Sequence, residues 1–259
     1  MIIKPLIRSL IQRIYKNKSN GVTSYYLNGF ESRISAAEWQ ISRCTGNCLL
    51  EIGCGKDLHT SLVAAIRFNK KAIAFDVTEI ADWELINYTA KRLGCMLEIC
   101  SPQDLKKIGV NYIVADSIDG ISGYDEIVST AVFEHIPIDA LNSIFNRAAK
   151  IGVKTITANI DFTDHWSYIE SVRGDAFYYI SEFTWKILNN NRMYQNRLRF
   201  SDISNMAISN GFRLSEIEKS IFNFKIDEEK LNDRFKRYSL SDLEMRQCLV
   251  KWDFFNPND

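Results

Sequence analysis

The chain has 259 residues, 46% hydrophobic and 12% aromatic, which is enough for one large domain with a substantial core. Its 32 Lys and Arg residues balance its 32 Asp and Glu residues. No basic excess predicts a nucleic-acid partner, and no acidic excess predicts disorder. No apolar run is long enough to predict a membrane span.

Residues 1–20 predict a basic amphipathic helix. Their apolar side chains recur at helical spacing, and lysines and arginines occupy the other face. Such a helix can pack on its own domain or on a second subunit, or residues 1–19 can contact an anionic membrane surface peripherally. A second helix is expected from Glu31 to Ser42. Residues 1–44 are therefore predicted to be helical and to precede a main domain at 45–259.

Strands and helices are predicted to alternate from residue 47 onward. Each predicted strand is short and almost wholly apolar, which is typical of a parallel sheet covered on both faces. The expected strands lie within 47–57, 71–77, 110–116, 124–137 and 154–161, and the expected helices at 59–68, 82–94, 101–109 and 138–152.

The remaining chain begins with a polar, aromatic-rich insertion at about 162–200. A helix at 201–211 and strands at 212–219 and 246–255 follow. The expected fold is α/β and Rossmann-like, a mostly parallel seven-stranded sheet with an antiparallel C-terminal edge. We expect the insertion aromatics to form a small lid core, although aromatic rings also stack on sugars.

The segment LLEIGCGKD, residues 49–57, predicts a strand, a glycine turn and a helix. Gly53 and Gly55 would let a nucleotide-like ligand approach the backbone. The third glycine of the dinucleotide pattern is absent, because position 58 is Leu. Glu51 suits a ligand with a cationic amino group better than a pyrophosphate.

Acidic residues follow the next strands. Asp76 lies about 20 residues after the glycine turn, where a carboxylate can accept both ribose hydroxyls of NAD or of S-adenosylmethionine. Asp116 and Ser117 follow the third strand and could meet an adenine, although Asp116 could equally cap a turn. Glu134 and His135 follow the fourth strand.

In order and spacing, LLEIGCG, FDV, VADS and YDEIVSTAVFEHIP resemble the class I S-adenosylmethionine-dependent methyltransferases. The downstream NIDFTDHWSYI and NRLRFSD resemble a bacterial subgroup often associated with cell-surface polysaccharide synthesis. The resemblance covers roughly residues 45–252. The loop KDLH after Gly55 departs from the family, where many members have a further glycine.

The resemblance implies S-adenosyl-L-methionine as the cofactor and a role for each matching residue. Glu51, Gly53 and Gly55 would line its methionine part, and Asp76 would hold the ribose. Asp116 and Ser117 would lie by the adenine, and Glu134 and His135 would flank the sulfonium.

Asp161, Asp164 and His165 follow the fifth strand, at the sheet edge where ligands bind in open α/β folds. We predict that His165 is the base that deprotonates the acceptor, with Asp161 or Asp164 orienting it or binding the acceptor. Alternatively, Asp164 caps a helix and His165 makes a structural hydrogen bond. His135 competes as the base.

Arg197 and Arg199 are spaced by two in an expected extended segment, so they would point the same way and could bind a phosphate or sugar carboxylate. The alternative is a salt bridge to acids of the insertion. The six cysteines have no zinc-site spacing, and no metal ligands are predicted. No cleavable signal peptide is recognisable, so a cytoplasmic location is expected, with peripheral contact at the inner membrane face as a further option.

These features predict a methyltransferase, most specifically one that O-methylates a saccharide or precursor in cell-surface polysaccharide synthesis. The acceptor would be a small-molecule or lipid-linked saccharide, with no nucleic acid involved. The alternatives are a methyltransferase of a small metabolite, a nucleotide-cofactor oxidoreductase, and a non-catalytic binding protein on the same fold. The sequence predicts no oligomeric state.

Overall fold

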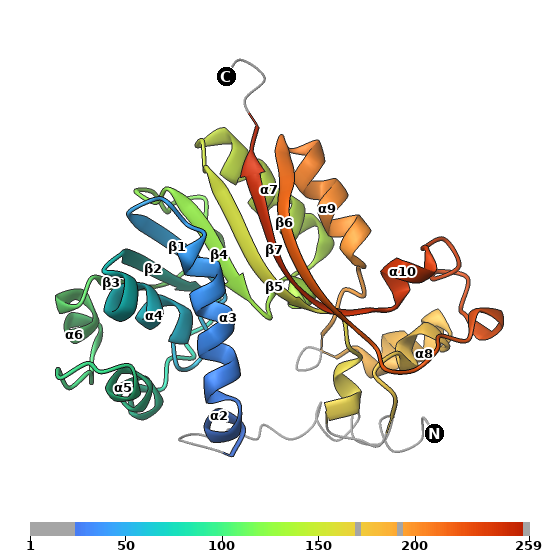
Figure 1. Ribbon diagram of the computed structural model, residues 1–259, viewed down its shortest axis with the longest axis horizontal. Helices are drawn as coiled ribbons and strands as arrows, with labels where there is room; N and C mark the ends of the chain where they lie inside the picture. The colour runs from blue at the N-terminus through green and yellow to red at the C-terminus, as the bar shows by residue number, and fades with distance from the viewer. Residues whose placement is uncertain (1–23, 169–171, 191–193, 256–259) are drawn as a thin grey trace.

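A seven-stranded mixed sheet forms the centre of the computed structural model, which describes residues 24–168, 172–190 and 194–255 (Figure 1). The strand order is β3-β2-β1-β4-β5-β7-β6. The first five strands in this order are parallel, and β7 runs antiparallel to both β5 and β6. The strands are β1 Cys48–Ile52, β2 Lys71–Asp76, β3 Val110–Val114, β4 Glu126–Thr130, β5 Thr155–Asp161, β6 Phe212–Ile221 and β7 Met245–Phe254.

Most helices lie where the sequence predicts them. The α-helices are α2 Ser24–Asn28, α3 Phe30–Ser42, α4 His59–Phe68, α5 Trp83–Arg92, α6 Pro102–Lys107, α7 Ile138–Lys150, α8 Glu182–Leu188, α9 Phe200–Ser209 and α10 Leu240–Leu243. Short 3-10 helices are η1 Phe133–His135, η2 His165–Tyr168, η3 Ala176–Tyr178 and η4 Glu228–Lys230. The helix expected in residues 1–20 lies outside the described residues.

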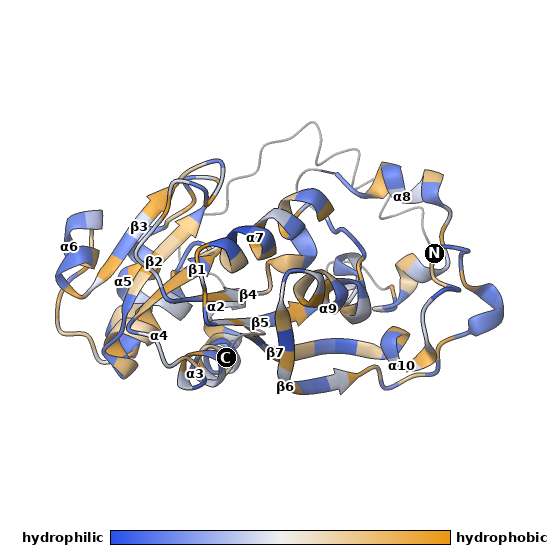
Figure 2. Ribbon diagram, turned by 90° about the horizontal axis from the view of Figure 1, so that it is seen from above, coloured by the Kyte–Doolittle hydropathy of each residue, from blue (hydrophilic) through white to orange (hydrophobic). Residues whose placement is uncertain are grey.

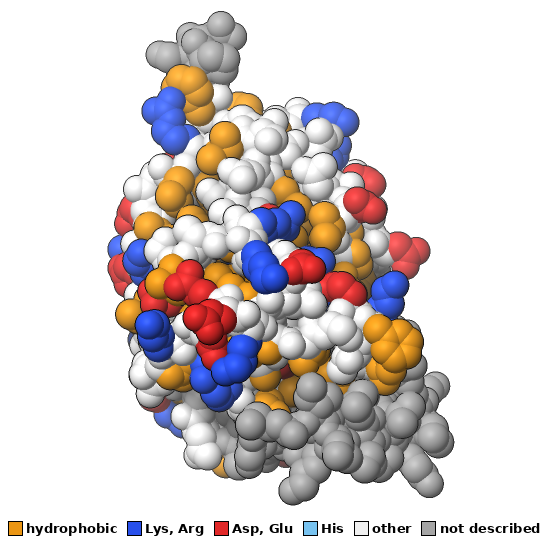
Figure 3. All heavy atoms as spheres, turned by 90° about the vertical axis from the view of Figure 1, so that its right-hand side faces the viewer, with side chains coloured by type: hydrophobic (Ala, Val, Ile, Leu, Met, Phe, Trp, Pro, Cys, Tyr) orange, Lys and Arg blue, Asp and Glu red, His pale blue; other side chains and the backbone are white. Residues whose placement is uncertain are grey.

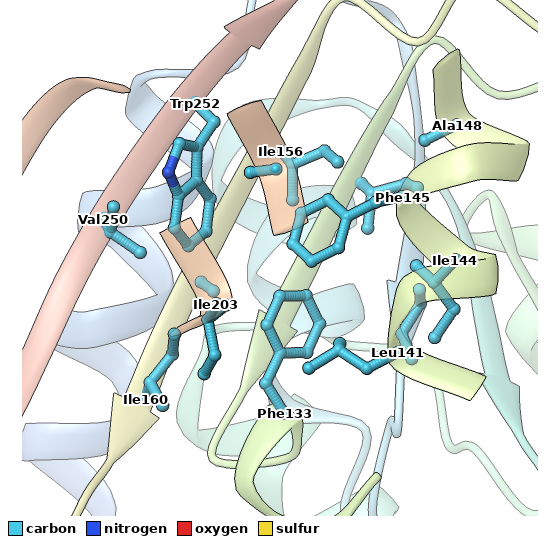
Figure 4. Close-up of a cluster of buried hydrophobic side chains, with 14 of the residues drawn as sticks. Phe133, Leu141, Ile144, Phe145, Ala148, Ile156, Ile160, Ile203, Val250 and Trp252 are labelled. Atoms are coloured by element: carbon cyan, nitrogen blue, oxygen red, sulfur yellow. The ribbon is translucent and has the colours of Figure 1, made fainter. Parts of the chain in front are cut away.

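Alternation along the strands gives the sheet two apolar faces. Leu50 and Ile52 of β1 point to one face, which packs against α7 and α9. Leu49 points to the other, which packs against α3, α4 and α5. Figure 2 shows the sheet between these two helical layers. Figure 4 shows the core of the first face, where Phe133 and Trp252 pack on either side of Phe145 at ring centroid distances of 5.8 and 5.9 Å.

A third apolar cluster lies apart from the sheet core. Trp166, Phe177, Tyr178 and Trp185 come from the predicted insertion, and Phe235 comes from the segment between β6 and β7. These side chains are almost fully buried against one another. The expectation that the insertion aromatics form a small core is therefore correct.

The molecular face on the side of α8 and α10 mixes acidic and basic side chains (Figure 3). Phe183, 75% exposed, adds an apolar side chain there. Within the described ranges, no helix combines the length and the apolar character needed to cross a bilayer.

Candidate active site

The glycine turn after β1 lies at the edge where the parallel strands end, beside the point where the sheet order reverses between β1 and β4. Gly53 and Gly55 both have positive φ, +72° and +66°. A Cβ on Gly53 would lie 2.5 Å from the Val132 side chain, whereas a Cβ on Gly55 would meet no atom within 4 Å. Gly53 is therefore required by packing, and Gly55 faces open space that a ligand could use.

Glu51 is buried one strand residue before this turn. Its carboxylate accepts hydrogen bonds from the Ser61 backbone N–H at 2.9 Å and from the Ser61 hydroxyl at 2.5 Å. Burial raises the pKa of Glu51 to about 7, against the lowering effect of nearby His59. Glu51 thus joins β1 to the start of α4, and its predicted place beside the methionine part of a cofactor stays a prediction.

Asp76 ends β2 and is 8% exposed. Burial raises its pKa, although backbone hydrogen bonds from Thr78, Gly55 and Val77 lower it. The carboxylate therefore belongs to the same strand edge as the glycine turn, as the ribose-binding prediction requires.

Asp116 and Ser117 follow β3 and are exposed. The Ser117 hydroxyl donates to Asp119 at 3.1 Å. Both residues line a shallow hollow of about 540 Å³ with Ile73 and Ile113 of the neighbouring strands. The Ala115 N–H donates to the Asp76 carbonyl at 3.2 Å, so Asp116 follows the strand next to Asp76, and its predicted place by the adenine stays a prediction.

Four titratable side chains meet where β4 and β5 end, and we call them the His–carboxylate cluster: Glu134, His135, Asp161 and His165. The two imidazole rings lie 4.7 Å apart between centroids. His165 Nε2 lies 3.6 Å from Asp161 Oδ2, and that carboxylate also accepts a 2.5 Å hydrogen bond from the Tyr168 hydroxyl. The sequence placed these four residues in the site, and the structure brings them together.

Burial and mutual repulsion change the pKa values of this cluster. Burial raises the pKa of Glu134 well above its usual value, and the charge of Asp161 adds to the effect. Burial, reinforced by His165, lowers the pKa of His135. Burial also opposes ionisation of Asp161, but the nearby His165 and the hydrogen bonds from Tyr168 and Thr163 outweigh it and lower that pKa.

The polar segment 194–196 holds the cluster in place. The Tyr194 carbonyl accepts a hydrogen bond from His135 Nδ1 at 2.6 Å. Gln195 accepts from the His165 backbone N–H at 3.0 Å and donates to the Thr163 carbonyl. Asn196 donates to the Phe133 and Ile136 carbonyls on both sides of η1. Asn196 opens the NRLRFSD segment of the resemblance, whereas no role was predicted for Tyr194 or Gln195.

Asp164 immediately precedes the 3-10 helix η2 and accepts a 3.0 Å hydrogen bond from the Trp166 backbone N–H. This contact matches the alternative reading of Asp164 as a helix cap. Burial raises the pKa of Asp164 to about 6. Asp164 also lines a cavity of about 330 Å³, together with Trp166, Asp175, Tyr179, Leu188 and Lys230.

The arginine pair differs from the prediction. Arg197 has a φ of +56°, so the segment is not extended and the two side chains diverge. Arg197 forms a 2.7 Å salt bridge with Glu182 of the insertion, which is the alternative arrangement, and stacks on Trp185. Arg199 is fully buried and donates to the backbone carbonyls of Phe162, Asp242, Leu243 and Met245.

The geometry of Arg199 therefore supports a structural role. Its guanidinium joins the end of β5 to the start of β7, where no acceptor can reach it in this conformation. A shared phosphate clamp formed by both arginines is not present in the structure.

Comparison with solved structures identifies the class to which this fold belongs. The magnesium protoporphyrin IX methyltransferase ChlM from Synechocystis PCC 6803, crystallised with bound SAH, is 14% identical with a TM-score of 0.53, and the match covers 95% of this chain and 93% of that one. A geranyl diphosphate methyltransferase in complex with GPP and sinefungin is 13% identical with a TM-score of 0.51, over 96% and 94% of the two chains.

The S-adenosylmethionine-dependent methyltransferase SibL in its apo form is 11% identical with a TM-score of 0.53, and the match covers 98% of this chain and 69% of that one. A scan against protein-family models finds no match, and a search of the curated proteins finds none either. The chain thus has the fold of the class I S-adenosylmethionine-dependent methyltransferases, which confirms the predicted fold class.

Proposed function

We propose that the protein is an S-adenosylmethionine-dependent methyltransferase that acts on a hydroxyl group of a small-molecule acceptor. One observation carries the proposal: the glycine turn, the buried Asp76 and the His–carboxylate cluster follow different strands and lie at the same sheet edge. This is the edge at which open α/β sheets bind ligands. The structural neighbours with this fold support the same reading.

The residues present fit this cofactor. Gly55 leaves open space beside the turn, and Asp76 offers a carboxylate for ribose hydroxyls. When bound, S-adenosylmethionine supplies a methyl group on a positively charged sulfur. Glu51, Gly53 and Gly55 would hold its methionine part, Asp76 the ribose, and Asp116 and Ser117 the adenine.

On the acceptor side, the chain must align a hydroxyl with the methyl group and take away its proton. His165 is our first candidate for the proton acceptor, because Asp161 lies beside Nε2 and can orient the ring. His135 is the second candidate, since its Nδ1 is engaged by Tyr194 and Nε2 remains for the substrate. Asp164 belongs to the neighbouring cavity, where it can contact the acceptor.

We further propose a saccharide or a precursor of cell-surface polysaccharide as the acceptor. The support is the resemblance of residues 159–169 and 196–202 to that subgroup, together with the aromatic and charged lining of the cavity beside Asp164. Residues 1–19, which lie outside the described chain, would bring a cytoplasmic enzyme to the inner membrane face. A small metabolite is the alternative acceptor.

Calorimetry with S-adenosylhomocysteine and with NAD tests the cofactor assignment. We expect the former to bind and NAD to give no heat. Asp76→Asn should weaken binding by about tenfold or more, because it removes a charged hydrogen-bond acceptor. The exposed Asp139→Asn is the matched control and should bind like the wild type. Binding of NAD alone would favour an oxidoreductase instead.

Transfer of a labelled methyl group into fractionated cell-envelope precursors tests the activity. We expect label in a saccharide-containing fraction. His165→Ala should keep S-adenosylhomocysteine affinity and lose turnover. Label only in low-molecular-weight metabolites would support the metabolite alternative, and cofactor binding without transfer to any fraction would support a non-catalytic protein.

A further inference from the structure

Three side chains of the His–carboxylate cluster point their donor atoms at one another. One ligand atom from each of Glu134, His135 and His165 lies within 4.8 Å of the other two. The first two come from η1 after β4, and the third comes from η2 after β5. Donor atoms around one cation lie roughly 3 to 4 Å apart, so small side-chain rotations would close the set.

Two of these donor atoms are buried without a hydrogen-bond partner. They are Glu134 Oε2, in a side chain that is only 4% exposed, and His165 Nε2. A buried polar atom without a partner costs free energy, and native proteins rarely leave one without a reason. Among the described residues, His165 Nε2 has only Asp161 Oδ2 nearby, at 3.6 Å, and the Glu134 and His165 side chains both belong to the set with ligand atoms within 4.8 Å, so one bound ion would complete both.

His135 is oriented in the manner of a metal ligand. Its Nδ1 donates to the Tyr194 carbonyl at 2.6 Å, which fixes the tautomer and leaves the lone pair of Nε2 free. Histidines that bind metals in proteins usually donate their other ring N–H to a carbonyl or carboxylate in this way. The same segment, through Gln195, also holds the backbone of His165.

We propose that Glu134, His135 and His165 bind a divalent transition-metal ion. Two imidazole nitrogens and one carboxylate oxygen suit Mn²⁺, Fe²⁺, Co²⁺ or Zn²⁺ better than Mg²⁺ or Ca²⁺, which prefer oxygen ligands throughout. A cation would also reduce the repulsion between the negative charges of Glu134 and Asp161. The sequence did not predict this site, because the expectation of no metal ligands rested on the spacing of the cysteines.

The catalytic consequence rests on the proposed methyltransferase function. Positions on the cation not filled by protein could bind the acceptor hydroxyl and favour loss of its proton to Asp161, which lies 3.6 Å from His165 Nε2. The hydroxyl oxygen then bonds to the methyl carbon, and the carbon–sulfur bond breaks with its electron pair going to sulfur. In this arrangement His165 is a ligand and not the base.

Metal titration of untagged protein tests the site directly. After dialysis against EDTA, Mn²⁺, Co²⁺, Zn²⁺ and Mg²⁺ are added separately and followed by calorimetry, and Co²⁺ also by its visible absorption. We expect one equivalent of Mn²⁺, Co²⁺ or Zn²⁺ to bind more tightly than Mg²⁺. No binding of the three transition metals to folded protein would overturn the proposal.

Substitutions show whether the bound ion occupies this cluster. Glu134→Gln and His165→Gln should each weaken Co²⁺ binding by about tenfold or more and change its spectrum, while circular dichroism confirms folding. His59→Gln is the matched control, because His59 pairs with Asp57 at the start of α4 and lies outside the cluster. If both cluster variants bind Co²⁺ like the wild type, the assignment is wrong.

Methyl transfer by metal-free and metal-loaded protein tests the catalytic part. S-adenosylhomocysteine calorimetry on the metal-free protein shows separately whether the cofactor assignment holds. We expect cofactor binding without metal and turnover only with it. Full turnover in EDTA, with the site shown to be empty, would overturn the catalytic role and return His165 to the role of base.

Discussion

At the scale of single residues, burial changes the pKa values of several carboxyl groups. Glu51, Asp76, Glu134 and Asp164 all have raised pKa values, with burial as the largest cause in each. All four follow or end strands at the same edge of the sheet or in the segment next to it. Groups with shifted pKa values collect at functional sites, so this distribution agrees with an active site at that edge.

Glu51 allows a prediction for stability against pH. Its pKa rises from 4.5 in the unfolded chain to about 7 in the folded protein, so the folded state binds the proton more tightly. The stability due to this proton is complete below pH 4.5 and is lost as pH rises to about 7. Relative to Glu51→Gln, the wild type should lose up to about 3 kcal/mol over this range.

Chemical denaturation of both proteins at a series of pH values measures this difference. Titrating groups that do not interact with Glu51 are common to both proteins and cancel, whereas the titration of His59 is coupled to that of Glu51. Glu98→Gln, at an exposed position, should follow the wild-type curve at every pH. A constant difference between wild type and Glu51→Gln would show that Glu51 does not titrate in this window.

At the scale of elements, the two glycines of the turn between β1 and α4 differ in what surrounds them. Gly53 packs against Val132, while its N–H donates to the Phe75 carbonyl of β2 at 2.9 Å. Gly55 has a similar positive φ but no neighbour in the direction of a Cβ. The first glycine therefore serves the joint between elements, and the second leaves open the space that we propose for the cofactor.

Alanine substitutions should separate these tasks. Gly53→Ala adds a methyl group into the Val132 side chain, and overpacking of this kind costs about 1 to 3 kcal/mol in addition to the strain at positive φ. Gly55→Ala carries the same strain but meets no protein atom, so it should lose less stability and still weaken S-adenosylhomocysteine binding. Thermal unfolding and calorimetry measure the two effects. Equal losses of stability with unchanged affinity for Gly55→Ala would contradict the division.

Element boundaries could be predicted well wherever periodicity alone decides them. The helix predicted at 59–68 is α4, and Ser101 caps α6 with Pro102 at its first position. Local sequence suffices there, because each element buries one continuous face. The helix α8 and the contacts of Arg199 were not predicted. The start of α8 carries a local signal, Ser181 as its cap, but the contacts of Arg199 depend on carbonyls far along the chain.

In the candidate site, too, some residues could be predicted from the sequence and others could not. Asp76 and the His–carboxylate cluster were predictable, because strand ends converge at one edge of a parallel sheet whatever the loops do. The support from Tyr194 to Asn196 was not, since Tyr194 acts through its backbone carbonyl and the side chains of Gln195 and Asn196 bond to backbone groups far along the chain.

At the scale of the whole molecule, the third apolar cluster extends beyond the insertion that the sequence predicted. The insertion at 162–200 supplies Phe177 and Tyr178, but Phe235 comes from the segment between β6 and β7. The acceptor-side cavity lies in this appended layer, where Asp227 and Lys230 join the lining from the same later segment. The layer is thus built by two distant segments, both attached to the sheet.

Phe235→Ala tests whether this layer is a separate folding unit. The ring packs on Tyr178 and Phe177 at centroid distances of 4.7 and 5.6 Å, and removing a buried Phe costs about 3 to 5 kcal/mol. We expect faster hydrogen exchange in 176–188 and 222–243 and loss of methyl transfer, because the acceptor cavity opens. Binding of S-adenosylhomocysteine should persist, since the residues proposed to hold it lie on or directly after β1, β2 and β3, outside this layer.

Phe145→Ala in the sheet core is the matched control, because its ring is equally buried but packs on Phe133 and Trp252. It should lower the protection of the whole sheet and weaken cofactor binding along with transfer. If Phe235→Ala instead exposes the sheet strands to exchange to the same extent as Phe145→Ala, the two cores unfold together. The acceptor side would then be an integral part of the sheet domain rather than a layer with its own stability.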